Sequence, residues 1–207
     1  MTGLFFGSFN PIHTGHVALA KHIWEQLALE EIWFVVSPHN PLKPQSSLID
    51  NDLRLQMVDL ALVEEPEFKS CDIEFSMPLP NYTIDTLQKL QEKYSKKQFV
   101  LIIGADNLAV FPEWKNYKQL LEEYTIVVYP REGFDLPQLH KTYPQVQVVD
   151  APLYPVSSTQ IRQLLKQGKD VSGFLHPAVC RFIREKEIYN LCDCGLISEH
   201  SRTTSPQ

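Results

Sequence analysis

The sequence predicts a single-domain α/β protein, built on a doubly wound, Rossmann-like parallel sheet with helices on both faces. Two observations support this fold class. Short apolar runs lack the alternation of a strand with one wet face, which is typical of strands buried on both sides. Segments with helical period separate these runs, and such a succession of strand and helix implies right-handed crossovers between parallel strands.

Five apolar runs are expected to form the strands, at residues 3–6, 32–36, 99–103, 125–129 and 146–149. Apolar positions spaced by three and four residues predict helices around residues 17–27, 53–61, 84–91, 159–166 and 177–189. Thr83 and the pair Ser157 and Ser158 are expected to cap helix starts, because their hydroxyls accept hydrogen bonds from unpaired backbone amides. Gly168 is expected to end the helix that Ser157 and Ser158 begin.

The composition limits the possible functions. The 207-residue chain has a formal net charge of -6, whereas proteins that wrap nucleic acid usually carry a basic excess. No apolar run approaches the ~20 residues of a membrane span, and no signal peptide follows Met1, so a cytoplasmic protein is expected. Residues 1–190 are expected to form the domain and residues 191–207 a polar, flexible tail. The thiols of Cys71, Cys180, Cys192 and Cys194 are expected to be incidental.

The turn after the first predicted strand concentrates residues suited to binding a phosphate. From Gly7 to His16 the chain reads Gly-Ser-Phe-Asn-Pro-Ile-His-Thr-Gly-His and then enters a helix. Glycines allow a ligand close to the backbone, and the unpaired amides of a helix start attract an anion. His13 and His16 can both donate hydrogen bonds to phosphate oxygens. A polar loop pair or a zinc site is the alternative interpretation of the two histidines.

The turn also resembles a known signature. The sequence contains neither a Gly-x-Gly-x-x-Gly fingerprint nor a Walker loop, so dinucleotide oxidoreductases and P-loop enzymes lose their main support. The pattern Gly-x-Phe-x-Pro-x-His-x-Gly-His instead resembles the signature of nucleotidyltransferases related to class I aminoacyl-tRNA synthetases. Its fixed positions are filled here by Gly7, Phe9, Pro11, His13, Gly15 and His16.

A second motif near the other end of the chain supports the same superfamily. Residues 156–162 read Val-Ser-Ser-Thr-Gln-Ile-Arg, with hydroxyls at a helix start and a guanidinium one turn later. This resembles the Ile-Ser-Ser-Thr-x-Ile-Arg element of these enzymes, which implies that the segment binds the β- and γ-phosphates of ATP. Taken alone, the segment would be better explained as a plain helix cap with a surface arginine at position 162; the first motif makes this the less favoured interpretation.

The middle of the chain indicates the molecule that accepts the nucleotide. Three stretches resemble the nicotinate-nucleotide adenylyltransferase family, at residues 37–43, 82–87 and 103–107, the last followed by Trp114. Trp114 offers a flat face to a pyridine ring, Thr83 offers donors to a carboxylate, and Asp106 can accept from ribose hydroxyls. Lys43 could reach a phosphate. Each residue also has a plainer alternative as a packing, capping or surface residue.

The resemblance implies a set of site residues. The catalytic side chains are expected to be those of His13, His16 and Arg162. ATP is expected to contact Gly7, Ser8, Phe9, His13, Gly15, His16, Gly104, Asp106, Ser157, Ser158, Thr159 and Arg162. The acceptor is expected to contact Lys43, Tyr82, Thr83, Asp106, Trp114 and Arg131. No side chain is expected to ligate a metal; Mg²⁺ is expected to arrive bound to the ATP phosphates and to water.

The implied reaction transfers AMP from ATP to nicotinate mononucleotide, giving nicotinate adenine dinucleotide and pyrophosphate in NAD biosynthesis. Two alternatives stay open. One is a pantetheine-phosphate adenylyltransferase or another adenylyl- or cytidylyltransferase of the same fold. The other is a non-catalytic nucleotide- or metal-binding protein, in which His13, His16, His22 or His39 would bind zinc. The oligomeric state is not predicted.

Overall fold

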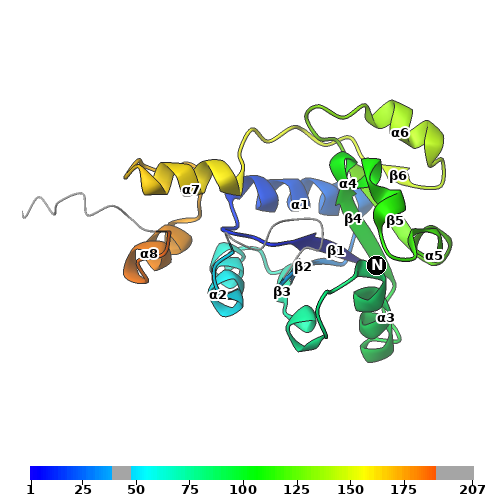
Figure 1. The fold of residues 1–207 in the computed structure, drawn as a ribbon, viewed down its shortest axis with the longest axis horizontal. Helices are drawn as coiled ribbons and strands as arrows, with labels where there is room; N and C mark the ends of the chain where they lie inside the picture. Colours follow the sequence, from blue (N-terminus) through cyan, green and yellow to red (C-terminus); the bar gives the residue numbers. More distant parts are fainter. Residues whose placement is uncertain (39–47, 190–207) are drawn as a thin grey trace, which may run out of the picture.

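Within residues 1–38 and 48–189, which the computed structural model describes, six parallel strands form one sheet in the order β3-β2-β1-β4-β5-β6 (Figure 1). The strands are β1 (Thr2–Gly7), β2 (Glu31–Val36), β3 (Phe68–Cys71), β4 (Phe99–Gly104), β5 (Thr125–Tyr129) and β6 (Gln147–Val148). This order, with two wings that start from the centre, is that of a doubly wound fold.

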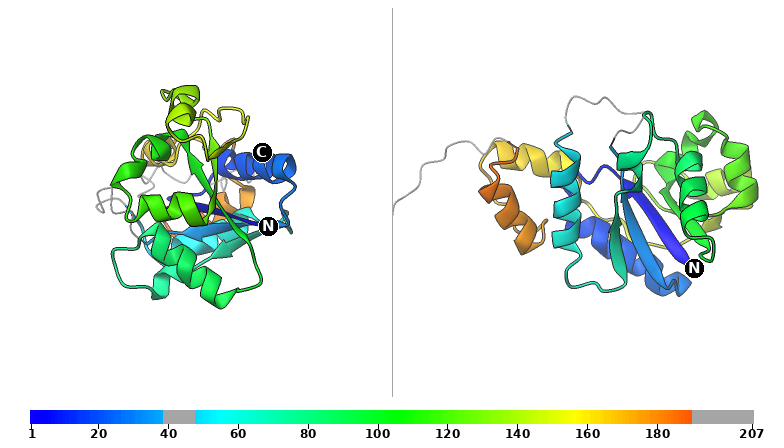
Figure 2. Two further views of the ribbon diagram at one scale, coloured as in Figure 1. Left: turned by 90° about the vertical axis from the view of Figure 1, so that its right-hand side faces the viewer. Right: turned by 90° about the horizontal axis from the view of Figure 1, so that it is seen from below.

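Helices cover both faces of the sheet. They are α1 (Thr14–Leu27), α2 (Asn51–Ala61), α3 (Thr83–Lys93), α4 (Ala105–Ala109), α5 (Tyr117–Glu123), α6 (Leu136–Thr142), α7 (Ser158–Lys166) and α8 (Pro177–Glu185). Short 3-10 turns, η2 (Ile73–Ser76) and η3 (Phe111–Glu113), join some of them. Figure 2 shows α8 and α6 at opposite ends of the molecule.

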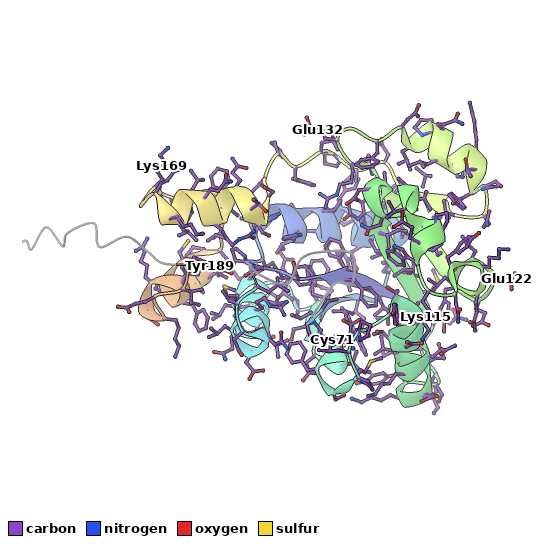
Figure 3. All side chains as sticks on the ribbon, viewed as in Figure 1. Cys71, Lys115, Glu122, Glu132, Lys169 and Tyr189 are labelled. Atoms are coloured by element: carbon purple, nitrogen blue, oxygen red, sulfur yellow. The ribbon has the colours of Figure 1, made fainter. Side chains whose placement is uncertain are left out.

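The core confirms the predicted burial of the sheet on both sides. Consecutive strand residues point into different clusters, so Leu4 belongs to one and Phe5 to the other. The helices α1, α2, α7 and α8 pack on the Phe5 side, while α3, α4, α5 and α6 pack on the Leu4 side. Side chains fill the space between α8 and α2, where Tyr189 lies (Figure 3). The predicted α/β fold class is therefore confirmed.

The topology indicates where on the sheet a ligand can bind. After β3 the chain crosses back to the centre and adds β4 beside β1, so the strand order reverses between these two neighbours. Loops on either side of such a reversal leave a crevice at the carboxyl ends of the strands. The strands end there at Gly7, Val36, Gly104 and Tyr129.

Several elements differ from the sequence predictions. The strand β3 was not predicted, because it has only four residues and only Phe68 among them is buried. The helices α5 and α6 were missed for a similar reason, since each has seven residues and one buried side chain. The last helix ends at Glu185, earlier than the sequence indicated. Thr83 does not cap α3: Tyr82 precedes the helix as its cap residue and makes no side-chain capping bond.

Other helix signals are confirmed. Ser157 caps α7 by accepting a hydrogen bond from the backbone amide of Gln160, and Gly168, with φ of 65°, follows the end of that helix. In the described part of the chain, no helix is long and apolar enough to cross a membrane. Cys71 and Cys180 are free thiols. The predicted tail lies outside the described residues, so the division at residue 190 stays a prediction.

The amino-terminal edge of the sheet carries a buried carboxylate. Glu31 receives hydrogen bonds from Lys69 at 2.6 Å and from Lys97 at 2.5 Å. Burial favours the neutral form of Glu31, but these hydrogen bonds outweigh it and lower the pKa to about 2. This ion-pair group stabilises the sheet edge opposite to the crevice.

Candidate active site

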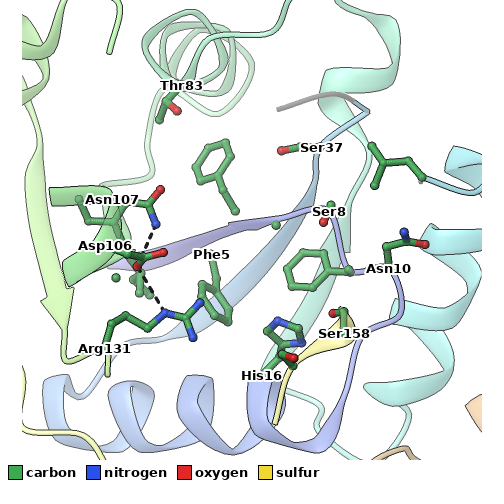
Figure 4. Close-up of a pocket in the computed structure, with 18 of the residues that line it drawn as sticks. Phe5, Ser8, Asn10, His16, Ser37, Thr83, Asp106, Asn107, Arg131 and Ser158 are labelled. Carbon is green, nitrogen blue, oxygen red and sulfur yellow. Dashed lines mark hydrogen bonds and ion pairs between the residues drawn. The ribbon is translucent and has the colours of Figure 1, made fainter. Parts of the chain in front are cut away.

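A cavity of about 520 Å³ lies at the crevice (Figure 4). Most of the predicted site residues line it. They are Gly7, Ser8, Phe9, His13, His16, Tyr82, Thr83, Gly104, Asp106, Trp114, Arg131, Ser157, Ser158, Thr159 and Arg162. Gly15 is not among the lining residues, and Lys43 lies outside the described residues. The two sequence motifs therefore meet at one site.

The two histidines of the first motif lie against each other at the start of α1. The His13 backbone amide donates to Nδ1 of His16 at 3.2 Å, and the two imidazole rings stack with centroids 3.6 Å apart. Because Nδ1 of His16 accepts this hydrogen bond, the proton of the neutral ring resides on Nε2. His16 therefore brings an N–H donor to the cavity wall in its uncharged form.

His13 is uncharged at neutral pH. Its side chain is buried, and burial, followed by the positive charge of Arg131, lowers its pKa to about 4. A neutral imidazole interacts with a phosphate oxygen as a hydrogen-bond donor, without adding a full positive charge. The sequence left the charge state open, and the structure decides it for His13.

The backbone between the strand and the histidines is bent around Phe9. This residue has φ of 44°, a left-handed conformation uncommon outside glycine, and its side chain is buried. Its ring meets the His16 ring edge-on, with centroids 5.3 Å apart. A Cβ atom on Gly7 would lie 2.8 Å from atoms of the Phe9 ring. Glycine at position 7 thus leaves the space in which Phe9 supports His16.

The second motif is hydrogen-bonded to the first. Arg162 in α7 donates from Nη1 to the Asn10 carbonyl oxygen at 2.7 Å, a contact between residues 152 positions apart. Ser158 donates to the Pro11 carbonyl oxygen at 2.8 Å. Nη2 of Arg162 also donates to the Thr159 hydroxyl at 3.2 Å. These bonds fix the start of α7 against the turn that carries the histidines.

Gly15 contributes to this junction by packing. A Cβ atom at position 15 would lie 2.6 Å from Cγ1 of Val156 and 3.2 Å from Nδ1 of His13. Any side chain there would force the segment before α7 away from α1, because contacts this short do not occur between real Cβ atoms and their neighbours. The structure therefore explains Gly15 by close approach of the two motifs.

The loops after β4 and β5 form a second wall. Asp106 accepts a hydrogen bond from Nε of Arg131 at 3.3 Å (Figure 4). A Cβ atom on Gly104 would collide with Oδ1 of Asp106 and lie 3.0 Å from Cγ of Arg131. Glycine at position 104 therefore permits this pair. Arg131 also lies over the ring of Tyr129, 5.4 Å from its centroid.

The start of α3 and the loop with Trp114 form the remaining wall. Figure 4 shows Thr83 across the cavity from His16 and Ser158. Trp114 is half-buried and packs on Phe111 with ring centroids 5.1 Å apart. The structure thus gives Trp114 both of the roles considered from the sequence, since it packs on a core ring and lines the cavity.

Lys115 joins these two parts of the wall. Its Nζ lies 2.8 Å from Oδ2 of Asp85 in α3 and 4.9 Å from the centroid of the Tyr82 ring. Both carboxylate oxygens of Asp85 accept from this ammonium. The contact holds the Trp114 loop close to the first turn of α3.

A buried arginine supports the loops after β1 and β2. Arg54 in α2 is fully buried, and its Nη1 donates to the Ser8 carbonyl at 2.5 Å and to the Ser37 carbonyl at 2.8 Å. Its Nε donates to the Ile49 carbonyl at 3.2 Å. Burial lowers the pKa of this guanidinium. Arg54 therefore ties two strand ends of the crevice to one helix.

Glu74, Asn81 and Lys115 are polar residues of the cavity wall that lie outside every stretch that the sequence indicated. Glu74 lies in η2, which follows the unpredicted strand β3, so no strand-end signal marked it. Asn81 directly precedes the Tyr82 stretch and could have been included with it. Lys115 directly follows Trp114, and a single lysine in a loop gives no signal of a site.

The zinc alternative gains no geometric support. Among residues 1–38 and 48–189, no group of three or more His, Cys, Asp and Glu side chains is placed to hold a metal ion. His22 contacts the Asp150 carbonyl through Nε2 at 2.5 Å, away from the cavity. His39 lies outside the described residues.

Comparisons with known proteins agree with this geometry. The model of the cytidylyltransferase-like family matches residues 4–164. A probable nicotinate-nucleotide adenylyltransferase from Bacteroides thetaiotaomicron is 49% identical over 89% of this chain and 91% of its own length. The protein of the same description from Bacteroides fragilis is 48% identical over 88% and 90%.

Solved structures show the same fold. The nicotinic acid mononucleotide adenylyltransferase of Plasmodium falciparum, complexed with NaAD, superposes with a TM-score of 0.76 at 21% identity, over 92% of this chain and 98% of that one. A second structure of that protein, complexed with APC, gives a TM-score of 0.75 at 21% identity, with the same coverage of both chains.

Proposed function

The chain belongs to the cytidylyltransferase-like family and, within it, to the nicotinate-nucleotide adenylyltransferases, and from this membership we propose how its residues transfer AMP from ATP to nicotinate mononucleotide. The products are nicotinate adenine dinucleotide and pyrophosphate, in NAD biosynthesis. The observation that carries the proposal is the meeting of His13, His16 and Arg162 around one cavity.

The chemical step is an in-line substitution at phosphorus. A phosphate oxygen of nicotinate mononucleotide forms a bond to the α-phosphorus of ATP, and the bond from that phosphorus to the bridging oxygen of pyrophosphate breaks. The nucleophile is already an anion, so the step needs no protein base and no covalent intermediate. The protein accelerates it by positioning the two substrates and by stabilising the charge that develops in the transition state.

The histidine pair provides donors for that charge. His16 carries its N–H on Nε2, and His13 is neutral because of burial. Donors fixed before the reaction stabilise a transition state without reorganising during it. His13 and His16 therefore bind the α-phosphoryl oxygens in this proposal.

The start of α7 holds the leaving group. Ser157, Ser158 and Thr159 line the cavity at a helix N-terminus, where backbone amides and hydroxyls favour an anion. The guanidinium of Arg162 lies one turn further along the helix and is positioned by its bond to the Asn10 carbonyl. These groups bind the β- and γ-phosphates, which depart as pyrophosphate.

The other walls orient the remaining parts of the substrates. Asp106, held by Arg131 at 3.3 Å, accepts from ribose hydroxyls. Trp114 stacks on the pyridine ring, and the first turn of α3 at Thr83 presents amide donors to its carboxylate. The role of Lys43 stays a prediction because that residue lies outside the described part of the chain.

Mg²⁺ is proposed to accompany ATP. An ion held mainly by phosphate oxygens and water suits the octahedral preference of Mg²⁺. When bound, the ion neutralises charge on the phosphates. Chelation with EDTA is expected to abolish turnover, and excess Mg²⁺ is expected to restore it; undiminished turnover in EDTA would contradict this requirement.

The function is tested by pyrophosphate release. ATP is offered with nicotinate mononucleotide, nicotinamide mononucleotide or phosphopantetheine, and the product is identified by mass. The highest kcat/KM is expected with nicotinate mononucleotide. Release with phosphopantetheine alone would favour the alternative adenylyltransferase, and stoichiometric zinc without any pyrophosphate would favour a non-catalytic protein.

The remaining sequence predictions concern partners and location. ATP and nicotinate mononucleotide are the proposed small-molecule partners. Two expectations stay predictions: that the protein has no nucleic-acid or membrane partner, and that it is cytoplasmic. Gel mobility-shift assays with DNA and RNA would check the first for nucleic acid, and cell fractionation would check membrane association and location.

A further inference from the structure

The turn between β1 and α1 is bound by residues on both sides of α8. The Tyr189 hydroxyl, just after α8, donates to Oδ1 of Asn10 at 2.7 Å, across 179 positions of sequence. The Thr14 amide donates to the Phe174 carbonyl at 2.9 Å, shortly before α8. The end of the described chain is therefore fixed to the turn that carries the two histidines.

Asn10 connects the Tyr189 contact to the triphosphate end of the cavity. It is 2% exposed and is one of the residues that line the cavity (Figure 4). Its backbone carbonyl accepts from Nη1 of Arg162 at 2.7 Å, and its side-chain oxygen accepts from Tyr189 at the same distance. Because both contacts meet on one residue, a shift of Asn10 changes where the guanidinium is held.

The backbone after α8 takes two uncommon conformations to bring Tyr189 to Asn10. Glu187 has φ of 51° and Tyr189 has φ of 70°, a left-handed region that residues with a side chain seldom occupy. Between them, Ile188 is buried and its amide donates to the Ile183 carbonyl at 3.0 Å. Such conformations persist where the surrounding contacts over-determine them, and they often mark functional segments.

The Tyr189 side chain is suited to hold Asn10 in one position. Its ring packs on the core cluster to which α2 and α8 contribute (Figure 3). Burial raises the pKa of the phenol, although the positive charges of Arg162 and Arg54 act in the opposite direction. The phenol therefore stays protonated at neutral pH and serves as a donor to the Asn10 side chain.

We propose that Tyr189 is a positioning residue for the triphosphate, because by holding Asn10 it fixes the carbonyl that orients the Arg162 guanidinium. This inference rests on the proposed function, in which Arg162 binds the β- and γ-phosphates. Tyr189 is not among the residues that line the cavity, and it lies beyond residues 4–164, which the family model matches. It therefore acts through Asn10 and Arg162 rather than on the substrate.

The geometry of Arg162 explains why a remote hydroxyl affects ATP. Nη1 is bound to the Asn10 carbonyl and Nη2 to the Thr159 hydroxyl at 3.2 Å, so the plane of the guanidinium is set by these two contacts. A guanidinium is a rigid fork of donors, whose direction decides which phosphate oxygens it can reach. Without the Tyr189 hydroxyl, Asn10 loses a bond that fixes its side chain, and the fork loses part of its support.

The test is a double-mutant cycle of Tyr189→Phe with Arg162→Ala. Phenylalanine removes only the hydroxyl, and kcat/KM for ATP is expected to fall about 3-fold to 10-fold, the range for one lost hydrogen bond. KM for nicotinate mononucleotide is expected to stay within about 2-fold of the wild-type value, because the effect reaches only the triphosphate end. In the Arg162→Ala background, Tyr189→Phe is expected to lower kcat/KM for ATP by less than about 2-fold, since no guanidinium remains to be positioned.

Tyr143→Phe is the matched control. Tyr143 is also a half-buried tyrosine that directly follows a helix, α6, and it does not line the cavity. The helix α6 lies at the opposite end of the molecule from α8 (Figure 2). The kinetics of this variant are expected to equal those of the wild type, and the thermal midpoints of both variants measure what each hydroxyl contributes to stability.

Three kinetic results would overturn the inference. They are an unchanged kcat/KM for ATP in Tyr189→Phe, equal losses for ATP and the acceptor, and the same loss whether or not Arg162 is present. The last two would show a general structural role. If Tyr189→Phe does not fold, a crystal structure of the wild-type protein with a non-hydrolysable ATP analogue decides instead: a Tyr189 hydroxyl out of reach of Asn10, or an Arg162 turned away from the phosphates, overturns the inference.

Failure of the proposed function gives different results. A wild-type protein that releases no pyrophosphate from ATP and nicotinate mononucleotide would overturn the function first, and this inference with it. Wild-type kinetics for ATP in Arg162→Ala would remove Arg162 from the proposed site, whatever Tyr189→Phe does.

Discussion

At the triphosphate end of the cavity, hydrogen bonds join distant segments of the chain to each other, whereas at the acceptor end an exposed ion pair between Lys115 and Asp85 joins the Trp114 loop to α3. Arg162 and Ser158 donate to carbonyls of the first turn at 2.7 Å and 2.8 Å. Buried polar atoms without a hydrogen-bond partner in the described chain occur at both ends, at Nδ1 of His13 and at Nε1 of Trp114. Charge stabilisation benefits from a frame assembled beforehand, while selectivity benefits from contacts that only the correct ligand completes.

Among the substitutions that test this comparison, His16→Ala is expected to have the largest effect on the reaction rate. Replacing it with alanine removes a donor to the reacting phosphate, which typically costs ~3 kcal/mol and lowers kcat about a hundredfold or more. KM values are expected to change little, because the loss falls on the transition state. Steady-state kinetics measure both parameters. His22→Ala, on the same helix but away from the cavity, is the control, and normal turnover in His16→Ala would remove His16 from the mechanism.

Arg162→Lys tests whether the triphosphate end of the cavity depends on the several N–H donors of a guanidinium group. Lysine keeps the charge but cannot bond the Asn10 carbonyl, the Thr159 hydroxyl and a phosphate together. We expect KM for ATP to rise about 10-fold to 100-fold, with a much smaller change for the acceptor. Arg181→Lys, an exposed position of α8, should behave as wild type. Equal losses for both substrates would indicate that α7 positions the whole cavity.

The burial of His13 makes the stability of the protein sensitive to acid. Its pKa is lowered to about 4 from an ordinary value of 6.5, so His13 contributes stability above pH 6.5 that is lost as pH falls toward 4. Between pH 7 and pH 5 this loss amounts to about 2 kcal/mol in the free energy of unfolding. Glu31 contributes little to this change, because the stability that its lowered pKa provides is lost only as pH falls below its ordinary value of 4.5 toward about 2.

Denaturant unfolding at both pH values measures the effect of His13, with His13→Gln as the comparison. The glutamine variant should lose less stability than the wild type on acidification. Equal losses in the two proteins would mean that His13 is protonated in the folded state at pH 5, contrary to its burial.

Trp114→Ala should affect only the acceptor end, and by the smallest factor. Loss of an aromatic stacking partner is worth about 1 kcal/mol, so KM for nicotinate mononucleotide is expected to rise about 5-fold to 10-fold. KM for ATP should stay near the wild-type value. Equal changes for the two substrates would point to disturbed packing on Phe111, which the thermal midpoint would reveal.

The fold could be predicted to the extent that burial left a pattern in the sequence. The central strands β1, β2, β4 and β5 were found because they are apolar and buried on both faces. The edge strand β3 was not, since Lys69 faces solvent and binds Glu31 across the sheet. Propensity carries little information where a strand is short and half-polar.

The site could be predicted where one short segment holds several functional residues. The turn from Gly7 to His16 and the start of α7 were recognisable because glycine, histidine and hydroxyl residues are concentrated in them. Glu74 joins the cavity wall only through tertiary contacts, with Thr86 at 2.8 Å and with a cavity built by other elements. Arg54 resembled an ordinary helix residue until its guanidinium was found fully buried.

Gly15 lets the two halves of the catalytic site touch, because it places no side chain between them. With hydrogen at this position, Val156 rests directly on α1, and a methyl group would lie 2.6 Å from it. Wedging these surfaces apart by even an ångström would widen the gap between the imidazole pair and the guanidinium, and misalignment on that scale can cost a hundredfold in rate. Gly15→Ala is therefore expected to slow the enzyme, although residue 15 does not line the cavity.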